Sequence, residues 1–215
     1  MTISIAIPLF ERLTALDGIG PYEVLQRLPG ARVTFVGERI GEYRTENGML
    51  GLTADATYAD LTRPDVIVVP GGIGTRAVLE DGHPLVGWVR DAHPHTRFTT
   101  SVCTGSLVLA AAGLLNGLTA TTHWGAYDAL RDLGAEPTPE RVVEHLDQHI
   151  ITAAGVSSGI DMALRLSELL VDTDAAKAMQ LMIEYDPQPP FDSGVVEQAD
   201  EAILARVMDY ARHRN

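Results

Sequence analysis

The sequence has little cysteine and little positive charge. One cysteine, Cys103, stands among 215 residues, which excludes an intrachain disulfide and any metal site built from several cysteines. A single thiol also fits a reducing compartment, so we expect the protein in the cytoplasm. The 16 Lys and Arg residues against 29 Asp and Glu residues give a formal net charge of −13. This charge disfavours nucleic acid and anionic membranes as partners.

Long hydrophobic runs, repeats and low-complexity tracts are also missing. No apolar run approaches the roughly 20 residues that a membrane helix needs. Residues 1–8 carry no basic leader and are typical of a strand, so we expect no signal peptide. The proportions of hydrophobic (46%) and charged (21%) residues are ordinary for a soluble globular protein. A chain of this length fits one domain, 1–215.

What is present is an alternation of strand-like and helix-like segments. Such an alternation is typical of a mainly parallel sheet covered by helices, the α/β class. The pair Asn47-Gly48 predicts a tight hairpin. The main predicted strands are 3–9, 32–37, 65–69, 97–102, 142–145 and 149–152. The main predicted helices are 20–27, 83–92, 124–133, 157–171, 173–185 and 195–212.

Cys103 lies where a strand is predicted to turn sharply into a helix. The first N–H groups of that helix carry partial positive charge and favour thiolate over thiol. The spacing Cys-x-Gly also matches the second half of the nucleophile elbow G-x-S-x-G, although Ser101 replaces the leading glycine. The position therefore indicates a nucleophile. The alternative is a buried and inert cysteine, and partners around the thiol would decide between the two.

A glycine-rich turn, Pro70-Gly71-Gly72-Ile73-Gly74, follows the predicted strand 65–69. Sites in parallel α/β sheets form at the carboxyl ends of strands, so Gly71 and Gly72 are expected near Cys103. Glycines let backbone N–H groups approach a ligand, as an oxyanion hole requires. The alternative is a plain turn. A dinucleotide site is disfavoured because the full glycine fingerprint is missing.

Asp17 lies in a mostly apolar loop just before a predicted helix. One interpretation is an ordinary helix cap. The other is an acid beside the thiol of Cys103. Two negative charges in contact would repel, whereas a thiolate and a carboxylic acid that share one proton would not. Such a pair supplies a nucleophile with a proton donor at hand.

His123 follows a short β-like segment and precedes a predicted helix. It is a candidate general base, and the alternative is a structural cap of the following helix. The other histidines show no metal-ligand spacing with cysteine or acidic residues. We therefore predict that the protein binds no metal.

These segments, in this order and separation, resemble the DJ-1/PfpI superfamily and, within it, the bacterial isocyanide hydratases. The resemblance runs from about residue 3 to residue 192. It is carried by Thr100-Ser101-Val102-Cys103-Thr104-Gly105-Ser106-Leu107-Val108-Leu109, Ala120-Thr121-Thr122-His123-Trp124, Gly159-Ile160-Asp161 and Glu184-Tyr185-Asp186-Pro187-Gln188-Pro189-Pro190-Phe191.

The resemblance implies a flavodoxin-like three-layer sandwich, with helices on both faces of the sheet, and a homodimer that needs no cofactor. It implies that Cys103 attacks the terminal carbon of an isocyanide to form a thioimidate, which water releases as an N-substituted formamide. Asp17 would orient the substrate and transfer protons. Thr104, with backbone N–H groups near Gly72 and Thr104, would position thiol and substrate. Val156 would pack beside the nucleophile, with a carbonyl close to the sulfur.

Three departures bear on other members of the superfamily. Peptidase-like members carry histidine directly after the cysteine, where this chain has Thr104, which argues against proteolysis and amide transfer. Members that resemble DJ-1 itself usually carry glutamate in the acidic loop, where this chain has Asp17. Regulators with this fold append a helix-turn-helix module of about a hundred residues. The chain ends at Asn215 without one, so we expect no DNA binding.

Two other functions stay open. In a redox sensor or protective protein, Cys103 would be oxidised to sulfinate, which mass spectrometry after mild peroxide would detect. A glyoxalase or deglycase-type enzyme would convert methylglyoxal to lactate.

Overall fold

The computed structural model describes residues 2–80 and 82–212. The chain divides into two compact units, residues 1–183 (the main unit) and residues 184–215 (the C-terminal unit). All of the predicted site residues belong to the main unit.

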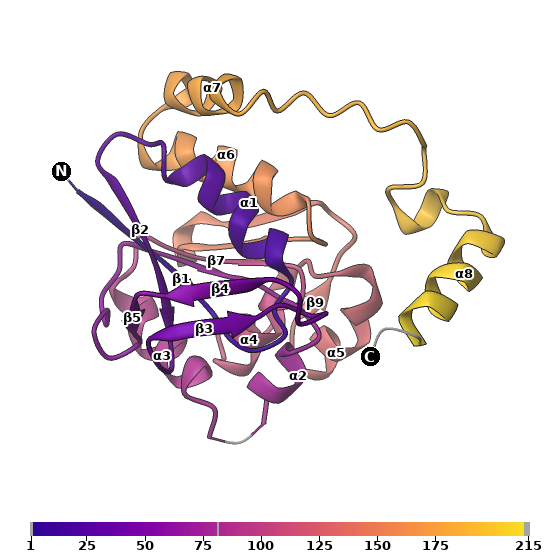
Figure 1. Ribbon diagram of the computed structural model, residues 1–215, viewed down its shortest axis with the longest axis horizontal. Coiled ribbons are helices and arrows are strands. Elements are labelled where there is room, and N and C mark those ends of the chain that lie inside the picture. Colours follow the sequence, from indigo (N-terminus) through magenta and orange to yellow (C-terminus); the bar gives the residue numbers. More distant parts are fainter. Residues whose placement is uncertain (1, 81, 213–215) are drawn as a thin grey trace. The chain divides into compact units, whose positions relative to one another are not determined.

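The main unit is built on a seven-stranded sheet (Figure 1). Its strands are all parallel to their neighbours except for β10, which runs antiparallel to β11. The mainly parallel sheet predicted from the alternating pattern is therefore confirmed. In order across the sheet the strands are β10 (Val142–His145), β11 (Ile150–Ala153), β7 (Phe98–Val102), β6 (Val66–Val69), β1 (Ile3–Pro8), β2 (Ala31–Gly37) and β5 (Ala56–Thr57).

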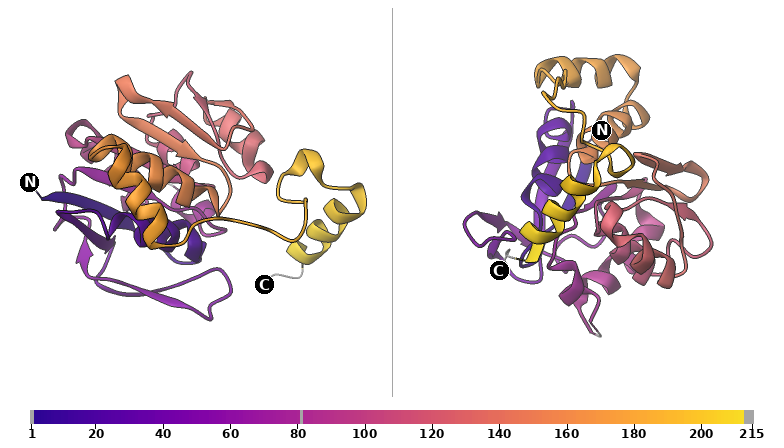
Figure 2. Two further views of the ribbon diagram at one scale, coloured as in Figure 1. Left: turned by 90° about the horizontal axis from the view of Figure 1, so that it is seen from above. Right: turned by 90° about the vertical axis from the view of Figure 1, so that its right-hand side faces the viewer.

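Helices cover both faces of this sheet, as Figures 1 and 2 show. The main unit's helices are α1 (Ala15–Leu25), α2 (Thr75–Val78), α3 (Pro84–Ala92), α4 (Gly105–Ala111), α5 (Tyr127–Asp132), α6 (Ser158–Leu170) and α7 (Thr173–Met182). Its short 3-10 helices are η1 (His93–His95), η2 (Trp124–Ala126) and η3 (Leu146–Gln148).

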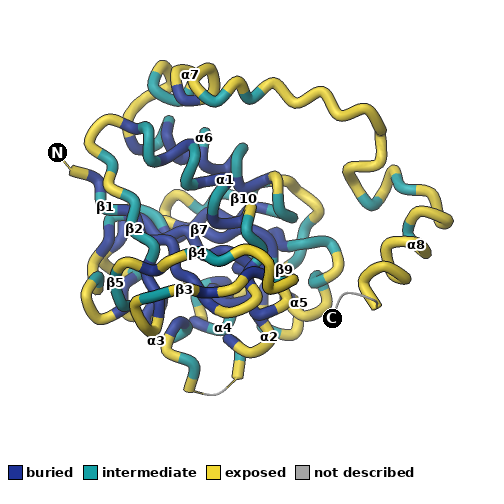
Figure 3. The backbone as a smooth tube through the Cα atoms, viewed as in Figure 1, coloured by how far each residue is buried: buried dark blue, intermediate teal, exposed yellow. Residues whose placement is uncertain are grey.

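The core consists of two hydrophobic clusters, one on each face of the sheet. Ile5 and Ile7 of β1 pack in the cluster that contains α1, α6 and α7, whereas Ala6 between them packs in the cluster of α2 to α5. This two-residue period follows from the pleat of a strand. Burying each such side chain stabilises the fold by about 1.5–3 kcal/mol. The expected three-layer, flavodoxin-like sandwich is confirmed, with buried residues concentrated on the strands and the facing helix surfaces (Figure 3).

Two small sheets lie beside the main one, β3 (Gly41–Arg44) with β4 (Gly51–Ala54) and β8 (Thr119–Ala120) with β9 (Glu136–Pro137). The β3–β4 pair is the hairpin predicted from Asn47-Gly48, and Gly48 has φ +71° in its turn. A parallel bridge between Leu13 and Thr45 joins this hairpin to the loop before α1. The hairpin is thereby attached to the segment that carries Asp17.

The first helix begins earlier than predicted. It starts at Ala15 instead of residue 20, and Pro21 lies inside it instead of in its first turn. A proline inside a helix costs about 3 kcal/mol because it lacks the N–H and crowds the preceding turn. Tertiary packing outweighs this cost, since Val24 and Leu25 are fully buried and α1 packs along α6.

The C-terminal unit contains η4 (Val196–Gln198) and α8 (Glu201–Arg212). A break at residues 199–200 divides the helix predicted over 195–212. The proline-rich stretch 186–190 has no helix, as expected from its composition. Within the described ranges, no helix is both long and apolar enough to cross a membrane.

Candidate active site

Cys103 lies at the predicted elbow, between the end of β7 and the start of α4. Its side chain is buried, with 4% of the residue exposed, and its φ is +57°. A non-glycine residue in this left-handed region costs about 1–3 kcal/mol, and such strain concentrates at functional sites. Hydrogen bonds hold the strained residue on both sides. Its N–H donates to Ala153 O and Ala154 O, and its carbonyl accepts from the hydroxyls of Thr122 and Ser106.

Glycines at two positions let the elbow pack directly on the turn after β6. A Cβ on Gly71 would lie 2.5 Å from Thr104 N, and a Cβ on Gly105 would lie 2.1 Å from Val69 O. Both approaches are too short for a side chain, so backbone packs on backbone here. The expected proximity of the Pro70-Gly71-Gly72 turn to Cys103 is confirmed.

Asp17 lies in the first turn of α1, not in a loop as predicted, because the helix begins at Ala15. It is fully buried, and its Oδ2 accepts a hydrogen bond from Gly71 N–H at 2.9 Å. Its carboxyl group also interacts with the Cys103 thiol, although Oδ1 makes no hydrogen bond of ordinary geometry. A buried acceptor left in this state costs about 1–3 kcal/mol, so stability alone does not account for Asp17.

The pKa of Asp17 is raised from 3.8 to about 7. Burial is the main cause, because removing the carboxyl from water disfavours its charged form. Hydrogen bonds from Gly71 N–H and the Cys103 thiol oppose the shift, and the negative charge of Glu46 adds to it. Asp17 is therefore able to hold or release a proton near neutral pH.

Burial also raises the pKa of the Cys103 thiol, and the negative charge of Asp17 raises it further. The backbone N–H groups of Thr104 and Val156 face the sulfur and lower the pKa. The expected effect of the helix start is thus present, but burial and Asp17 outweigh it. Burial and Asp17 thus disfavour the resting thiolate that the helix start alone would favour. Because ionised Asp17 disfavours the thiolate, the two groups together favour keeping one shared proton.

Thr104 braces the glycine turn. Gly72 N–H donates to Thr104 Oγ1 at 2.9 Å, and the Thr104 hydroxyl donates to Gly72 O at 3.2 Å. Thr75 Oγ1 lies 3.0 Å from Thr104 Oγ1. Since Gly71 N–H is bound to Asp17, the N–H groups of both glycines already have acceptors. In this structure the turn orients Asp17 and Thr104, and the oxyanion role of the two glycines stays a prediction.

Val156 contacts the nucleophile with its N–H, whereas the resemblance led us to expect a carbonyl. Its φ of +30° is unusual for a β-branched residue and turns the amide toward the sulfur. Val156 also packs in the same hydrophobic cluster as Cys103, which confirms the expected proximity.

His123 occupies the cap position of η2, and its Nδ1 accepts from Gly125 N–H at 3.2 Å. Its ring lies 5.2 Å from that of Trp124, and a Cβ on Gly155 would be 3.0 Å from its Cδ2. Burial lowers the pKa of His123, which keeps the ring neutral. The structure describes no hydrogen bond from this ring to Cys103. The capping alternative therefore accounts for its contacts.

Two further residues of the site were not predicted. Thr122 donates to the carbonyl of Cys103 at 3.0 Å, and the adjacent position of His123 in the sequence was a signal that could have pointed to it. Glu46 contributes charge near Asp17 from the β3–β4 hairpin, and no sequence pattern marks it.

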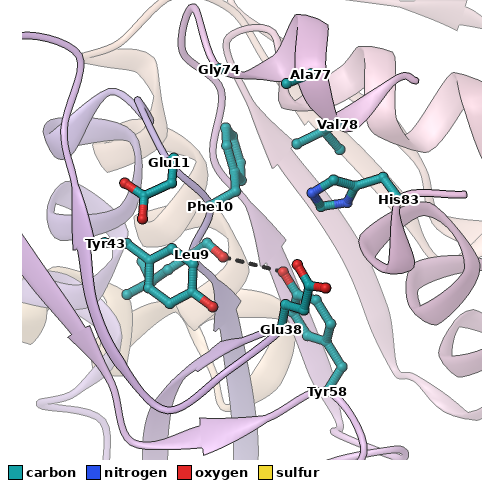
Figure 4. Close-up of a pocket in the computed structure, with 10 residues that line it drawn as sticks. All are labelled: Leu9, Phe10, Glu11, Glu38, Tyr43, Tyr58, Gly74, Ala77, Val78 and His83. Carbon is teal, nitrogen blue, oxygen red and sulfur yellow. Dashed lines mark hydrogen bonds between the residues drawn. The ribbon is translucent and has the colours of Figure 1, made fainter. Parts of the chain in front are cut away.

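A cavity of about 210 Å³ lies elsewhere in the main unit and contains none of the predicted site residues (Figure 4). Several of its polar groups have partners in the protein. Tyr58 donates to Leu9 O at 3.2 Å, and Glu11 pairs with Arg39, whose guanidinium lies 4.7 Å from the centre of the Tyr43 ring. The lining residues are Leu9, Phe10, Glu11, Glu38, Tyr43, Tyr58, Gly74, Ala77, Val78 and His83.

In the part of the chain that the structure describes, no group of three or more His, Cys, Asp or Glu side chains is arranged to hold a metal ion.

Known proteins resemble this chain in both sequence and structure. An isonitrile hydratase of Pseudomonas putida is 44% identical over 214 residues, which cover 100% of this chain and 90% of the relative. A ThiJ/PfpI family protein from Pseudomonas syringae superposes with a TM-score of 0.91 at 35% identity, covering 99% of this chain and 88% of the other. Drosophila melanogaster DJ-1beta shares the fold, with a TM-score of 0.77 at 20% identity, covering 87% of this chain and 100% of the other.

The family profile described as DJ-1/PfpI matches residues 3–169, which include the elbow, the glycine turn and Asp17. The match spans most of the main unit. On this match and on the full-length likeness to its relatives, the chain belongs to the DJ-1/PfpI family.

Proposed function

We propose that the protein is an isonitrile hydratase, which adds water to an isocyanide to give an N-substituted formamide. The observation that carries the proposal is the buried acid beside the thiol: Asp17, with a pKa of about 7, interacts with Cys103 in a strained elbow. An acid that titrates near neutral pH next to a nucleophile suits proton transfer. The 44% identity to the Pseudomonas putida enzyme over the whole chain supports the same reaction.

In the first proposed step, the sulfur of Cys103 bonds to the terminal carbon of R–N≡C. The thiol proton passes through Asp17 to that carbon, which gives the thioimidate R–N=CH–S–Cys103. Asp17 is placed for this transfer because its carboxyl interacts with the thiol and Gly71 N–H fixes Oδ2. The N–H groups of Thr104 and Val156 stabilise negative charge on the sulfur as its proton leaves.

In the second step, water adds to the thioimidate carbon. Asp17 accepts a proton from the water and passes it to the nitrogen, which gives R–NH–CH(OH)–S–Cys103. The carbon–sulfur bond then breaks, the hydroxyl proton returns to the sulfur, and R–NH–CHO leaves. The sum is R–N≡C plus H₂O to R–NH–CHO, with both protein groups restored. The sequence of steps needs no oxidant, metal or cofactor.

Thr104 and the glycine turn would act as the support of this pair. Thr104 fixes the turn through Gly72, and the turn orients Asp17 through Gly71. We also propose that the protein works as a cytoplasmic homodimer on a small-molecule isocyanide, as the resemblance implies.

The rival functions make different demands on the thiol. Oxidation to sulfinate needs only the thiolate and an oxidant, whereas hydration also needs an adjacent group that carries a proton, as Asp17 can. The structure offers no comparable observation in favour of methylglyoxal chemistry.

The test is incubation of the purified protein with a simple alkyl isocyanide, followed by mass spectrometry of the products. The proposal predicts N-alkyl formamide from the wild type and none from Cys103→Ala. Parallel samples receive mild peroxide or methylglyoxal. Sulfinate on Cys103 or lactate, without formamide, would replace the proposal with the corresponding rival.

A further inference from the structure

The β3–β4 hairpin extends one acidic side chain, Glu46, toward the segments that hold Asp17. Glu46 Oε1 accepts a hydrogen bond from Thr14 Oγ1 at 2.9 Å and another from Ile73 N–H at 3.2 Å. The backbone N–H of Glu46 donates to Leu13 O at 3.1 Å. One carboxylate therefore contacts two segments that are far apart in the sequence.

Both of these segments hold Asp17 directly. Thr14 is the residue at the start of α1, whose first turn carries Asp17. Ile73 follows the turn in which Gly71 N–H donates to Asp17 Oδ2. Glu46 thus links α1 to the glycine turn from the hairpin. Both of these segments contact the buried Asp17. Its acceptor oxygen fixes where these two segments lie relative to each other.

We propose that Glu46 is a positioning residue of the thiol site, whose carboxylate holds α1 against the glycine turn and places a negative charge near Asp17. Its effect on hydration rests on the proposed function, whereas its effect on Asp17 and Cys103 does not. A protonated Asp17 leaves the thiol free of the adjacent negative charge that disfavours its ionisation. Glu46 would in this way widen the pH range over which the pair is reactive.

The charges around the pair support this role. After burial, the negative charge of Glu46 is the remaining cause that raises the pKa of Asp17, and at His123, whose pKa burial lowers, Glu46 opposes that shift. The other titratable group that acts on Asp17 is the Cys103 thiol at the end of β7. From α6 and β2, the side chains of Ile160 and Phe35 pack near the glycines of α1 and bring no charge.

Two substitutions separate the effect of the charge of Glu46 from the effect of its hydrogen bonds. Glu46→Gln keeps a carbonyl oxygen that accepts from Thr14 and Ile73 but removes the charge. Glu46→Ala removes both. The matched control is Glu42→Gln, which removes a charge from the same hairpin at an exposed residue that pairs with Arg44. Circular dichroism and thermal melting check that each variant folds.

The first readout is the rate at which iodoacetamide alkylates Cys103 between pH 5 and 10. Because the chain has one cysteine, the rate reports this site alone. We expect the wild-type profile to contain an inflection near the pKa of Asp17, about 7. In Glu46→Gln and Glu46→Ala the inflection should fall by about 0.5–1 pH unit. In Glu42→Gln it should stay in place.

The second readout is hydration of an alkyl isocyanide. Glu46→Gln should keep wild-type kcat/KM below pH 6, whereas Glu46→Ala should lose about tenfold at every pH because Asp17 is no longer held. If the inflection does not move in Glu46→Gln, the charge of Glu46 does not act on Asp17. If Glu46→Ala keeps full activity, Glu46 does not position Asp17. If the wild type hydrates no isocyanide, the proposed function fails, while alkylation still decides the electrostatic part.

Discussion

The thiol site and the cavity of Figure 4 both lie in the main unit, yet they differ in how their polar groups are satisfied. In the cavity, Tyr58 binds a backbone carbonyl and Glu11 binds Arg39, so those polar groups serve the fold. At the thiol site, Cys103 has a left-handed backbone and Asp17 is buried with one oxygen lacking an ordinary hydrogen bond. The proposed active site is therefore the one whose conformation and burial cost stability.

The proposed active site thus coincides with backbone strain and a buried acid, not with this cavity. A hollow in the surface requires only that side chains fail to fill it. Strain at Cys103 and the burial of Asp17 must be compensated by the rest of the fold, and proteins retain such features where they serve a purpose. Substitutions at the thiol site and in the cavity test whether the two regions differ in this way.

The largest expected effect is the loss of the nucleophile. Cys103→Ala should lower isocyanide hydration by at least about 10³-fold, because the proposed covalent intermediate forms on its sulfur. The control on the other side is His83→Ala, which removes an imidazole from the cavity of Figure 4 and should leave the rate within about twofold. Steady-state rates of formamide formation test both. Equal losses of hydration rate in Cys103→Ala and His83→Ala would contradict the assignment of the reaction to the thiol site.

The next effect concerns stability and follows from the raised pKa of Asp17. Its folded value of about 7 lies above the ordinary 3.8, so the folded state binds more protons than the unfolded state between these pH values. The stabilisation from this group is complete below about pH 4 and is lost as the pH rises to about 7. The full loss is at most about 4 kcal/mol for a shift of this size.

Asp17→Asn removes the titration. Relative to the wild type, its free energy of unfolding should therefore rise between pH 4 and pH 8 by up to about 4 kcal/mol. Urea denaturation at several pH values measures the difference. A difference that stays constant over this range would mean that Asp17 is ionised at neutral pH, as an ordinary surface carboxylate is.

A smaller effect is expected at Thr104. Thr104→Val keeps the shape of the side chain but leaves Gly72 N–H without its acceptor, which costs about 1–3 kcal/mol. Because the same turn orients Asp17, kcat/KM should fall about tenfold. Thr104→Ser retains the hydroxyl and should stay within about twofold of the wild type. Equal rates for the two variants would exclude the bracing role.

The smallest expected effect is a loss of stability on substitution of Tyr58 in the cavity of Figure 4. Tyr58→Phe removes the hydroxyl that donates to Leu9 O and should lower the free energy of unfolding by about 1 kcal/mol. The hydration rate should not change. A loss of activity without a loss of stability would show that the cavity takes part in the reaction.

Much of the architecture was predictable from local patterns. The apolar strand before Cys103 and the small residues after it predict the elbow, and Asn47-Gly48 predicts the hairpin. The start of α1 was not predictable in this way. Pro21 favours a helix that begins beside it, and only the packing of α1 on α6 reveals the longer helix.

The sequence predicted which residues form the site better than it predicted the contacts between them. Asp17 and Cys103 were expected together because parallel strands bring their carboxyl ends to one edge. The ionisation of Cys103 was not, because it depends on burial that a sequence does not display. Glu46 reaches the site through hydrogen bonds to Thr14 and Ile73, which join segments distant in the sequence.

The most direct test of the account is hydration of an alkyl isocyanide in H₂¹⁸O. The wild type should release N-alkyl formamide whose carbonyl carries ¹⁸O, since the oxygen comes from the water that attacks the thioimidate, and Cys103→Ala should release none. Unchanged isocyanide after incubation with the wild type, or the same yield of formamide from Cys103→Ala, would contradict the account.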